Sequence, residues 1–292
     1  MRPIAKSELI INEDGSIYHL NLKPGDIATT IITVGDPDRV EEVSKHFDTI
    51  DFKAHKREFK THTGTYKGKR ITVISTGIGT DNIDIVFNEL DALVNIDFKT
   101  RTIKKEHTTL TFIRIGTSGA IQKNIPIDSF LISEKAIGFD NLLHFYDTKN
   151  LLDHRFSDAL KTHCNWSPLN ASPYVVNASE KLLLNFNDTL FTRGCTATNV
   201  GFYGPQGREL RLKIKDENLN ERLASFQYQD IKITNLEMET SGIYGLAALL
   251  NHHAISLNAI LANRAAQTFS DSPNQTVAKL ITTTLNIIAN KV

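Results

Sequence analysis

The chain has few cysteines and no excess of charge of either sign, and each shortage excludes a class of protein. Only Cys164 and Cys195 occur among its 292 residues, which is too few for a disulfide framework and offers no metal-ligand spacing. Lys plus Arg and Asp plus Glu both number 33. No strongly basic or acidic field therefore argues for a nucleic acid or a cationic partner. These shortages favour a reduced, cytoplasmic protein.

Long apolar runs are also missing. No run approaches the roughly 18 residues that a membrane helix needs, and residues 1–6 lack the apolar core of a signal peptide. We therefore expect no membrane segment. A hydrophobic content of 40% and a charged content of 23% are ordinary for a globular protein with a sizeable core. Because no repeat, linker or low-complexity segment interrupts the chain, we expect a single domain over residues 1–292.

Predicted strands and helices alternate along the chain. Apolar and β-branched runs predict strands at 29–34, 111–115, 125–133, 190–198, 231–236 and 255–261, and a pair that opens at 55–59, turns at 67–69 and ends at 71–74. Helical spacing and capping residues predict helices from 37 and over 82–94, 179–186, 243–250 and 272–288. The charged stretch 97–107 is interpreted as a solvated loop, and 147–177 as surface connections. This alternation predicts an α/β domain with its site along one sheet edge.

The stretch 111–120 has the most informative pattern. An apolar, β-branched run ends at Arg114, and a small-residue segment from Gly116 to Gly119 follows it. We interpret the stretch as a buried strand that carries a guanidinium and a loop of N–H and hydroxyl donors to the sheet edge. Such groups can surround an anion. The alternative is an ordinary strand exit with a solvated arginine.

A second anion-binding pattern lies earlier in the chain. The predicted strand 29–34 is followed by Gly35, an aspartate suited to cap a helix, and a proline suited to its first position. Arg39 lies in the first turn of this helix. A strand, a glycine and a helix N-terminus in this order form a geometry that receives anions. The predicted strand 71–74 runs into a Gly-rich loop at 75–80, in which residues 77–79 lack the third glycine of a dinucleotide fingerprint.

Two later stretches carry polar side chains where strands end. Residues 200–208 combine aromatic rings and glycines with Gln206 and Arg208, although a turn with incidental polar groups has the same composition. Glu237 and Glu239 follow the predicted strand 231–236. Because side chains two residues apart in a strand point the same way, both carboxylates should share a face. An acidic pair at the start of a helix is the alternative interpretation.

Together these stretches resemble the successive signatures of the hexameric nucleoside phosphorylases. They occur between His19 and Arg264 in the family's order, at 34–40, 75–79, 114–120 and 236–239. The pattern Phe202-Tyr203-x-x-Gln206-x-Arg208 resembles the uridine phosphorylase branch of that family. The resemblance implies the nucleoside phosphorylase fold, a mixed and distorted, barrel-like central β-sheet flanked by helices.

The resemblance also implies a role for each matching residue. The phosphate would be held by Gly35, Arg39, Arg114, Thr117 and, from a neighbouring subunit, Arg57. The ribose would be held by Met238, Glu239 and, from the neighbour, His19. The base would be held by Phe202, Gln206, Arg208 and Arg264, the last steadying Arg208 or a water beside it. The residues closest to the chemistry would be Arg114, Arg208, Gln206 and Glu239.

The implied activity is reversible phosphorolysis of uridine, and of deoxyuridine or thymidine as further candidates, to a base and a pentose 1-phosphate. A guanidinium only donates hydrogen bonds whereas an amide both donates and accepts, so Arg208 and Gln206 match the edge of uracil. Phosphate is a co-substrate, and no cofactor is required. The resemblance further implies a structural potassium ion at Glu58 and Ser75, and a homodimer with shared sites that assembles into a homohexamer.

Other functions remain as alternatives. Purine-cleaving relatives generally carry an aspartate near Asn263, and related thioether-nucleoside hydrolases lack the phosphate arginines. A non-enzymatic, nucleoside-binding relative would have lost an arginine of the phosphate site or the ribose glutamate. The chain also departs from the pattern. It reads Gly204-Pro205 where relatives read Pro-Gly, has Gly207 where an acid is common, and is longer at 97–109 and 147–177.

Overall fold

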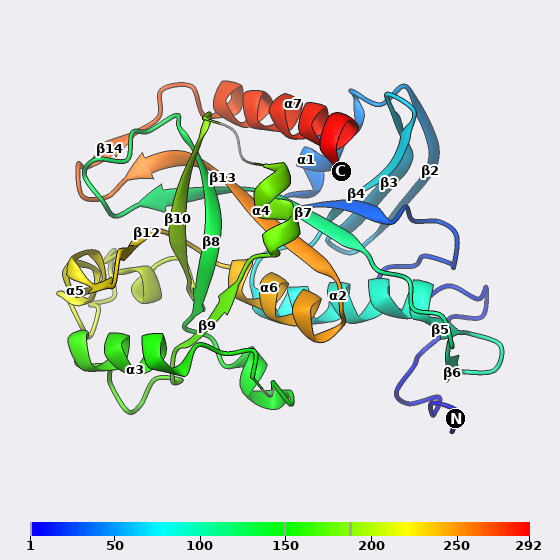
Figure 1. Cartoon of the computed structure of the whole chain (residues 1–292), viewed down its shortest axis with the longest axis horizontal. Helices are drawn as coiled ribbons and strands as arrows, with labels where there is room; N and C mark the ends of the chain where they lie inside the picture. The colour runs from blue at the N-terminus through cyan, green and yellow to red at the C-terminus, as the bar shows by residue number, and fades with distance from the viewer. Residues whose placement is uncertain (1, 149, 187–188) are drawn as a thin grey trace.

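A large mixed β-sheet passes through the molecule, and helices cover its faces (Figure 1). The computed structural model describes residues 2–148, 150–186 and 189–292. Its strands are β1 Thr30–Val34, β2 Thr49–Lys56, β3 Phe59–Tyr66, β4 Lys69–Ser75, β5 Ile96–Asp97, β6 Thr102–Ile103, β7 Thr111–Ala120, β8 Phe130–Gly138, β9 Tyr174–Asn177, β10 Phe191–Thr198, β11 Gln227–Tyr228, β12 Ile231–Glu237, β13 His253–Asn263 and β14 Thr268–Phe269. Its helices are α1 Pro37–Ser44, α2 Thr80–Asn95, α3 His154–His163, α4 Glu180–Asn185, α5 Leu219–Ser225, α6 Thr240–Leu249 and α7 Pro273–Lys291, with short 3₁₀ turns η1 Leu142–Phe145 and η2 Gly204–Gln206.

One strand closes part of this sheet into a barrel. The main order is β11-β12-β10-β8-β13-β7-β1-β4-β3-β2, and β12 also pairs antiparallel with β7, where Leu236 lies opposite Gly119. Because β13 pairs with both β7 and β8, the ring β7-β12-β10-β8-β13 returns to its starting strand. The predicted α/β architecture, a mixed and barrel-like sheet flanked by helices, is therefore confirmed.

The strand directions gather several chain segments at one edge. β1 pairs parallel with both β4 and β7, and β7 pairs parallel with β13. The carboxyl ends of these strands therefore meet at the same edge of the sheet. β12 approaches the end of β7 from the opposite direction, so Glu237, at the end of β12, arrives at this edge too.

The core has a layer on each face of the central strands. Along β7, Phe112 packs with α2 on one face, where its ring centroid lies 4.2 Å from that of Phe87. The next residue, Ile113, belongs to the cluster on the other face, which includes Leu285 of α7. This alternation follows from the two-residue period of a strand and explains why β7 is apolar at successive positions. No helix among the described residues combines the length and apolarity needed to cross a membrane.

The structure corrects the predicted end of the strand that contains Arg114. The small residues from Gly116 to Gly119 were predicted to form a loop, but they continue β7, which ends at Ala120. They can do so because β13 pairs along the whole of β7 and β12 pairs with its last two residues. The next strand, predicted at 125–133, spans Phe130–Gly138 instead. Local composition could not reveal these long-range pairings.

Three further segments differ from the prediction. The predicted strand pair is present as β3 and β4, but it opens at residue 59 rather than at residue 55. Residues 57 and 58 form the turn between β3 and an additional strand, β2, and Arg57 in this turn has a φ of +55°. The region 147–177, apart from residue 149, contains α3 and β9 rather than only surface connections. The charged stretch 97–107 contains part of the β5–β6 hairpin. The N-terminal arm docks on this hairpin, where the Ile4 N–H donates to the Arg101 carbonyl at 2.7 Å.

Gly64 of β3 provides a test of the packing between β2 and β3. A Cβ at this position would lie 2.0 Å from the Thr49 carbonyl oxygen, a backbone atom of the paired strand. We expect Gly64→Ala to lower the free energy of unfolding by about 2 kcal/mol, because the strands must separate to admit the methyl group. Chemical denaturation measures this change.

Gly204→Ala is the matched control. Nothing lies within 4 Å of a Cβ at Gly204, so its free energy of unfolding should change by less than about 0.5 kcal/mol. Equal losses in the two variants would show that the contact with Thr49 does not limit residue size at position 64.

Candidate functional site

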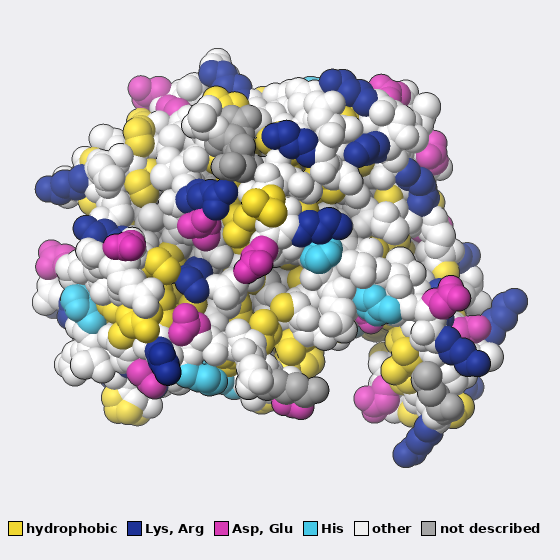
Figure 2. Space-filling view, viewed as in Figure 1, with side chains coloured by type: hydrophobic (Ala, Val, Ile, Leu, Met, Phe, Trp, Pro, Cys, Tyr) yellow, Lys and Arg dark blue, Asp and Glu magenta, His cyan; other side chains and the backbone are white. Residues whose placement is uncertain are grey.

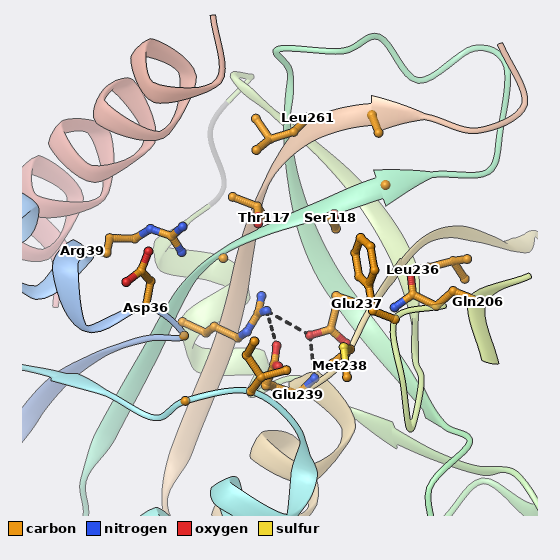
Figure 3. Close-up of a pocket in the computed structure, with 18 of the residues that line it drawn as sticks. Asp36, Arg39, Thr117, Ser118, Gln206, Leu236, Glu237, Met238, Glu239 and Leu261 are labelled. Carbon is orange, nitrogen blue, oxygen red and sulfur yellow. Dashed lines mark hydrogen bonds and ion pairs between the residues drawn. The ribbon is translucent and has the colours of Figure 1, made fainter. Parts of the chain in front are cut away.

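A cavity of about 800 Å³ opens where the strand ends gather. Figure 3 shows Arg39 on one side of it, Gln206 on the other, and Met238 and Glu239 between them. The lining includes ten of the residues singled out in the sequence, namely Gly35, Arg39, Glu58, Arg114, Thr117, Phe202, Gln206, Arg208, Met238 and Glu239. Segments that are up to two hundred residues apart in the sequence therefore share one cavity.

Four of the predicted residues are not in the lining of this cavity: His19, Arg57, Ser75 and Arg264. His19 directs its Nδ1 to Glu89 at 2.6 Å, and the His19 N–H donates to the same carboxylate. Arg57 is exposed in the β2–β3 turn, with its guanidinium carbon 5.9 Å from the centre of the Tyr18 ring. His19 and Arg57 thus belong to neighbouring parts of one surface outside the chain's own cavity.

The Arg114 guanidinium is buried between two carboxylates. Its Nη2 lies 2.6 Å from Glu239 and 3.2 Å from Glu237, and its Nη1 donates to the Asn258 side chain at 3.1 Å. Gly116 makes room for this group, because a Cβ there would lie 1.9 Å from Nη1. Burial in low dielectric opposes the charge, but Glu237 and Glu239 outweigh it and raise the pKa of Arg114. The alternative of a solvated arginine is therefore excluded at this position.

Glu237 organises the floor of the cavity. Its carboxylate accepts hydrogen bonds from the Thr198 hydroxyl at 2.7 Å, from the Glu239 N–H at 3.0 Å, and from the Thr240 N–H and hydroxyl at 2.9 and 2.8 Å. Sequence reasoning identified this acid only as half of a pair. The spacing of Glu237 and Glu239 at a strand end was the only sequence feature that pointed to Glu237. The donors that surround it come from β10, α6 and β7, which are far apart in the sequence.

Arg39 brings a second positive charge to the cavity. It lies in the first turn of α1, where the Asp36 side chain caps the helix by accepting the Asp38 N–H, as predicted. Burial, followed by repulsion from Arg114, lowers the pKa of Arg39. Arg39 and Arg114 repel one another and both line the cavity. An anion between them would relieve this repulsion, so the arrangement favours anion binding.

The segment 200–208 forms the opposite wall. The Arg208 guanidinium stacks 3.7 Å from the centre of the Phe202 ring, and its Nη1 donates to the Gln206 side-chain oxygen at 2.6 Å. Gln206 is buried, whereas Phe202 is half exposed. Burial, and then repulsion by Arg264, lowers the pKa of Arg208 to about 10. The wall therefore presents an amide, a guanidinium and an aromatic face together.

Arg264 has a different contact from the one predicted. Its guanidinium does not steady the Arg208 side chain but donates to the carbonyls of Gln206 and Gly207, the latter at 3.0 Å. It holds the backbone of the loop from behind because β13 ends there, next to η2. The neighbouring Asn263 is buried and donates to the carbonyls of Gln122 and Ile125, which fixes its amide in the scaffold.

The oxygen groups at Glu58 and Ser75 fit a monovalent cation in part. The Ser75 hydroxyl donates to the Glu58 carbonyl at 2.5 Å and accepts the Lys60 N–H at 2.7 Å, which leaves one lone pair on its oxygen. The Glu58 carboxylate has no hydrogen-bond or ion-pair partner among the described residues and lines the cavity. It can therefore supply a charged oxygen ligand.

A second group of potential ligands, Asp91, His107 and His252, does not fit a metal ion. Their candidate ligand atoms lie within 4.8 Å of one another. However, the Leu110 N–H donates to Nδ1 of His252 at 3.1 Å, so a neutral His252 carries its proton on Nε2. That nitrogen, 3.2 Å from Asp91, then has no lone pair for a metal.

The network around Glu237 makes a stability prediction. Glu237→Gln places an NH₂ group among several donors and removes one charge opposite Arg114, so we expect a loss of about 3 kcal/mol in the free energy of unfolding. Glu134→Gln is the control, because the side chains of Glu134 and its partner Arg193 are 41% and 39% exposed. The free energy of unfolding of this variant should fall by less than about 1 kcal/mol. Urea denaturation of both variants measures these changes. A loss of stability in Glu237→Gln no larger than that in Glu134→Gln would contradict the assigned network.

Comparison with known proteins places this arrangement in a family. The model of the phosphorylase superfamily matches residues 29–291. A uridine phosphorylase from Thermococcus kodakarensis is 30% identical over 283 residues, 95% of this chain and 88% of that protein. A DeoD-type purine nucleoside phosphorylase from Oceanobacillus iheyensis is 27% identical over 246 residues, 82% of this chain and 84% of that protein.

A solved structure supports the same placement. A nucleoside phosphorylase from Trypanosoma brucei, described as showing uridine phosphorylase activity, aligns with a TM-score of 0.84 at 28% identity and covers 97% of this chain and 98% of that one. The shared architecture, the matched span and the sequence identity agree, and the chain belongs to the phosphorylase superfamily.

Proposed function

We propose that the chain is a uridine phosphorylase, a pentosyltransferase that cleaves uridine reversibly with phosphate and serves pyrimidine salvage. One observation carries the proposal: a single cavity joins a pair of guanidiniums, a buried carboxylate and the Gln206–Arg208 wall. These groups match the three parts of the reactants, an anion, a sugar with hydroxyl groups and a pyrimidine edge. The uridine phosphorylases among the relatives support the same assignment.

The phosphate would lie between Arg39 and Arg114. Gly35 and Thr117 line the same part of the cavity and would complete the anion site with an N–H group and a hydroxyl. Phosphate is itself the nucleophile: one of its oxygens bonds to the ribose C1′ as the bond from C1′ to the base nitrogen breaks. The protein therefore has to place and stabilise the reactants rather than activate a side chain.

The sugar and the base would extend from this anion toward the loop 200–208. Glu239 would accept hydrogen bonds from the ribose hydroxyls, with Met238 against the sugar. Burial raises the pKa of Glu239, and the adjacent Arg114 opposes that rise because its positive charge favours the carboxylate. Negative charge developing on the departing uracil would be met by Arg208, while Gln206 pairs with its edge and Phe202 packs on the ring.

The alternatives differ from this proposal at identifiable residues. A hydrolase would not need Arg39 and Arg114, and a silent binding protein would not be expected to keep both together with Glu239. A purine nucleoside phosphorylase remains the nearest alternative, since DeoD-type enzymes are among the relatives. The Gln206–Arg208 pair favours a pyrimidine, and the Asn263 amide is committed to the scaffold. Uridine, deoxyuridine and thymidine would all fit this pattern.

We also propose that residues 1–292 form one domain and act as a homodimer within a homohexamer. In each dimer, His19 and Arg57 would enter the partner's cavity, which is supported by their location outside their own. A structural potassium ion would bind at Glu58 and Ser75 and would not take part in the chemistry.

Side chains of both charges are intermixed on the face in Figure 2, and the composition of the chain is balanced, which supports small molecules rather than nucleic acid as partners. Two buried free thiols support a cytoplasmic location.

The reaction class is tested by omitting phosphate. The purified protein is mixed with uridine, and uracil release is followed with and without phosphate, because a phosphorolytic reaction requires the anion as nucleophile. We expect release only with phosphate, together with formation of ribose 1-phosphate. Equal release in phosphate-free buffer would establish a hydrolase, and faster turnover of inosine than of uridine would establish the purine alternative. Parallel assays with deoxyuridine and thymidine define the sugar and base preference.

The shared site is tested by mixing two inactive variants, Arg57→Ala and Arg208→Ala. If Arg57 serves the partner's cavity, each mixed dimer has one cavity with both changes and one with neither. About half of the cavities in mixed dimers should then be active. A mixture of Arg208→Ala with Gln206→Ala is the control, since both changes affect the chain's own cavity and no activity should return. Absence of recovery in the first mixture, with chain exchange verified, would assign Arg57 to its own chain.

A further inference from the structure

A second cavity, of about 1080 Å³, lies behind the loop 200–208. Its walls come from the end of β8, from Trp166 and the residues after α3, and from 199–219. These elements form one end of the molecule, with α3 and α5 at the left of Figure 1. Arg208 borders both this cavity and the first one. The volume is slightly above the usual range of small-molecule sites, roughly 300–1,000 Å³, so a small molecule can be accommodated.

The inner end of the cavity offers an unused hydrogen-bond acceptor. Asn199 is 2% exposed, and its Nδ2 donates to the Ala197 carbonyl at 3.2 Å. Among the described residues, no donor reaches its Oδ1. Asp140 beside it is already satisfied, because its carboxylate accepts from Tyr174 at 2.7 and 2.8 Å and from Ser241 at 3.0 Å. A ligand with an N–H group would therefore find its partner in Asn199.

Aromatic rings also line the cavity. Trp166 packs on Phe139 with ring centroids 4.7 Å apart, and its indole N–H donates to the Ala171 carbonyl at 2.9 Å. Its polar atom is thus used, and the ring offers apolar surface. Tyr203 contributes a second ring from the loop that it shares with Arg208. Such surfaces favour a flat, unsaturated ring in the ligand.

The outer end carries positive charge without matching acids. Arg211, Lys213 and Lys215 line the cavity, and none has an ion pair among the described residues. Asp216, the acid of the same segment that lines the cavity, is paired with Arg222. Three unpaired cations at the mouth of an aromatic cavity favour an anionic group such as a phosphate.

We propose that this second cavity binds a nucleoside 5′-monophosphate as a regulatory ligand. The base lies between the rings of Trp166 and Tyr203 and donates to Asn199, while the phosphate lies at Arg211 and Lys213. Asn199 is buried whereas Arg211 and Lys213 are exposed, so the base would lie inside the cavity and the phosphate at its mouth.

Occupation of this cavity affects the first one through Arg208. An anion on this side attracts the guanidinium away from Gln206, which it now contacts at 2.6 Å. The affinity for the pyrimidine base then falls, whereas the phosphate site between Arg39 and Arg114 is unchanged. This effect on turnover rests on the proposed function, but binding of the nucleotide does not.

The test follows Trp166, the only tryptophan of the chain, by its fluorescence during titration with uridine 5′-monophosphate. We expect a saturable change whose midpoint rises at least roughly tenfold in the double variant Arg211→Ala/Lys213→Ala, since two charged contacts are lost. Lys99→Ala/Lys105→Ala, which removes two exposed charges elsewhere, should titrate like the parent protein. Uridine or inorganic phosphate alone should bind this cavity at least tenfold more weakly.

The first cavity is excluded as the source of the signal by a third variant. Gln206→Ala should leave the fluorescence titration intact. Loss of the signal in Gln206→Ala with retention in Arg211→Ala/Lys213→Ala would place the nucleotide in the first cavity and overturn the proposal, as would the lack of any saturable change. In the kinetic arm, the nucleotide should raise the KM for uridine, leave that for phosphate unchanged and lose this effect in Arg211→Ala/Lys213→Ala. If the nucleotide leaves the KM for uridine unchanged, the coupling through Arg208 is refuted.

Discussion

Burial of the Arg114 guanidinium is the constraint on which the rest of the site depends. An isolated buried charge would cost several kcal/mol, so the fold must supply compensating groups from elsewhere in the chain. Glu237 and Glu239 do so from the end of β12, and Asn258 does so from β13. The same carboxylates fix the start of α6, because Glu237 also accepts the Glu239 and Thr240 N–H groups. Charge compensation and the geometry of the cavity floor are therefore one arrangement.

The closed ring of strands makes this compensation possible. β12 pairs with β10 on one side and crosses the end of β7 on the other, which places Glu237 beside a strand more than one hundred residues earlier. Without that crossing, β7 would end in the loop that its glycines suggest. The closure also explains why the cavity lies here, since guanidiniums, carboxylates and the loop 200–208 meet at a common edge of the sheet.

The loop 200–208 links this edge to the rest of the molecule. Arg264 holds its backbone through the carbonyls of Gln206 and Gly207, while Arg208 lies between two cavities. A loop fixed on one side and shared on the other is suited to the proposed base site and to the ligand proposed behind it. The long segment 147–177 contributes to this arrangement, because it brings Trp166 against Phe139.

The sequence by itself determined the α/β architecture, the helix start that carries Arg39, the motifs that contain Arg114, Gln206 and Glu239, and the family resemblance. Period, capping and short motifs are local properties, which is why they could be identified without the structure. It placed the end of β7 too early, missed α3 and β9, and did not reveal the contact of Arg264 with the backbone of the loop. Each of these depends on contacts between distant segments: β7 continues because β12 and β13 pair with it, and Arg264 reaches a backbone 57 residues away. Only the tertiary structure decided that Glu237 anchors the site, because its donors come from three separate elements that meet through sheet closure.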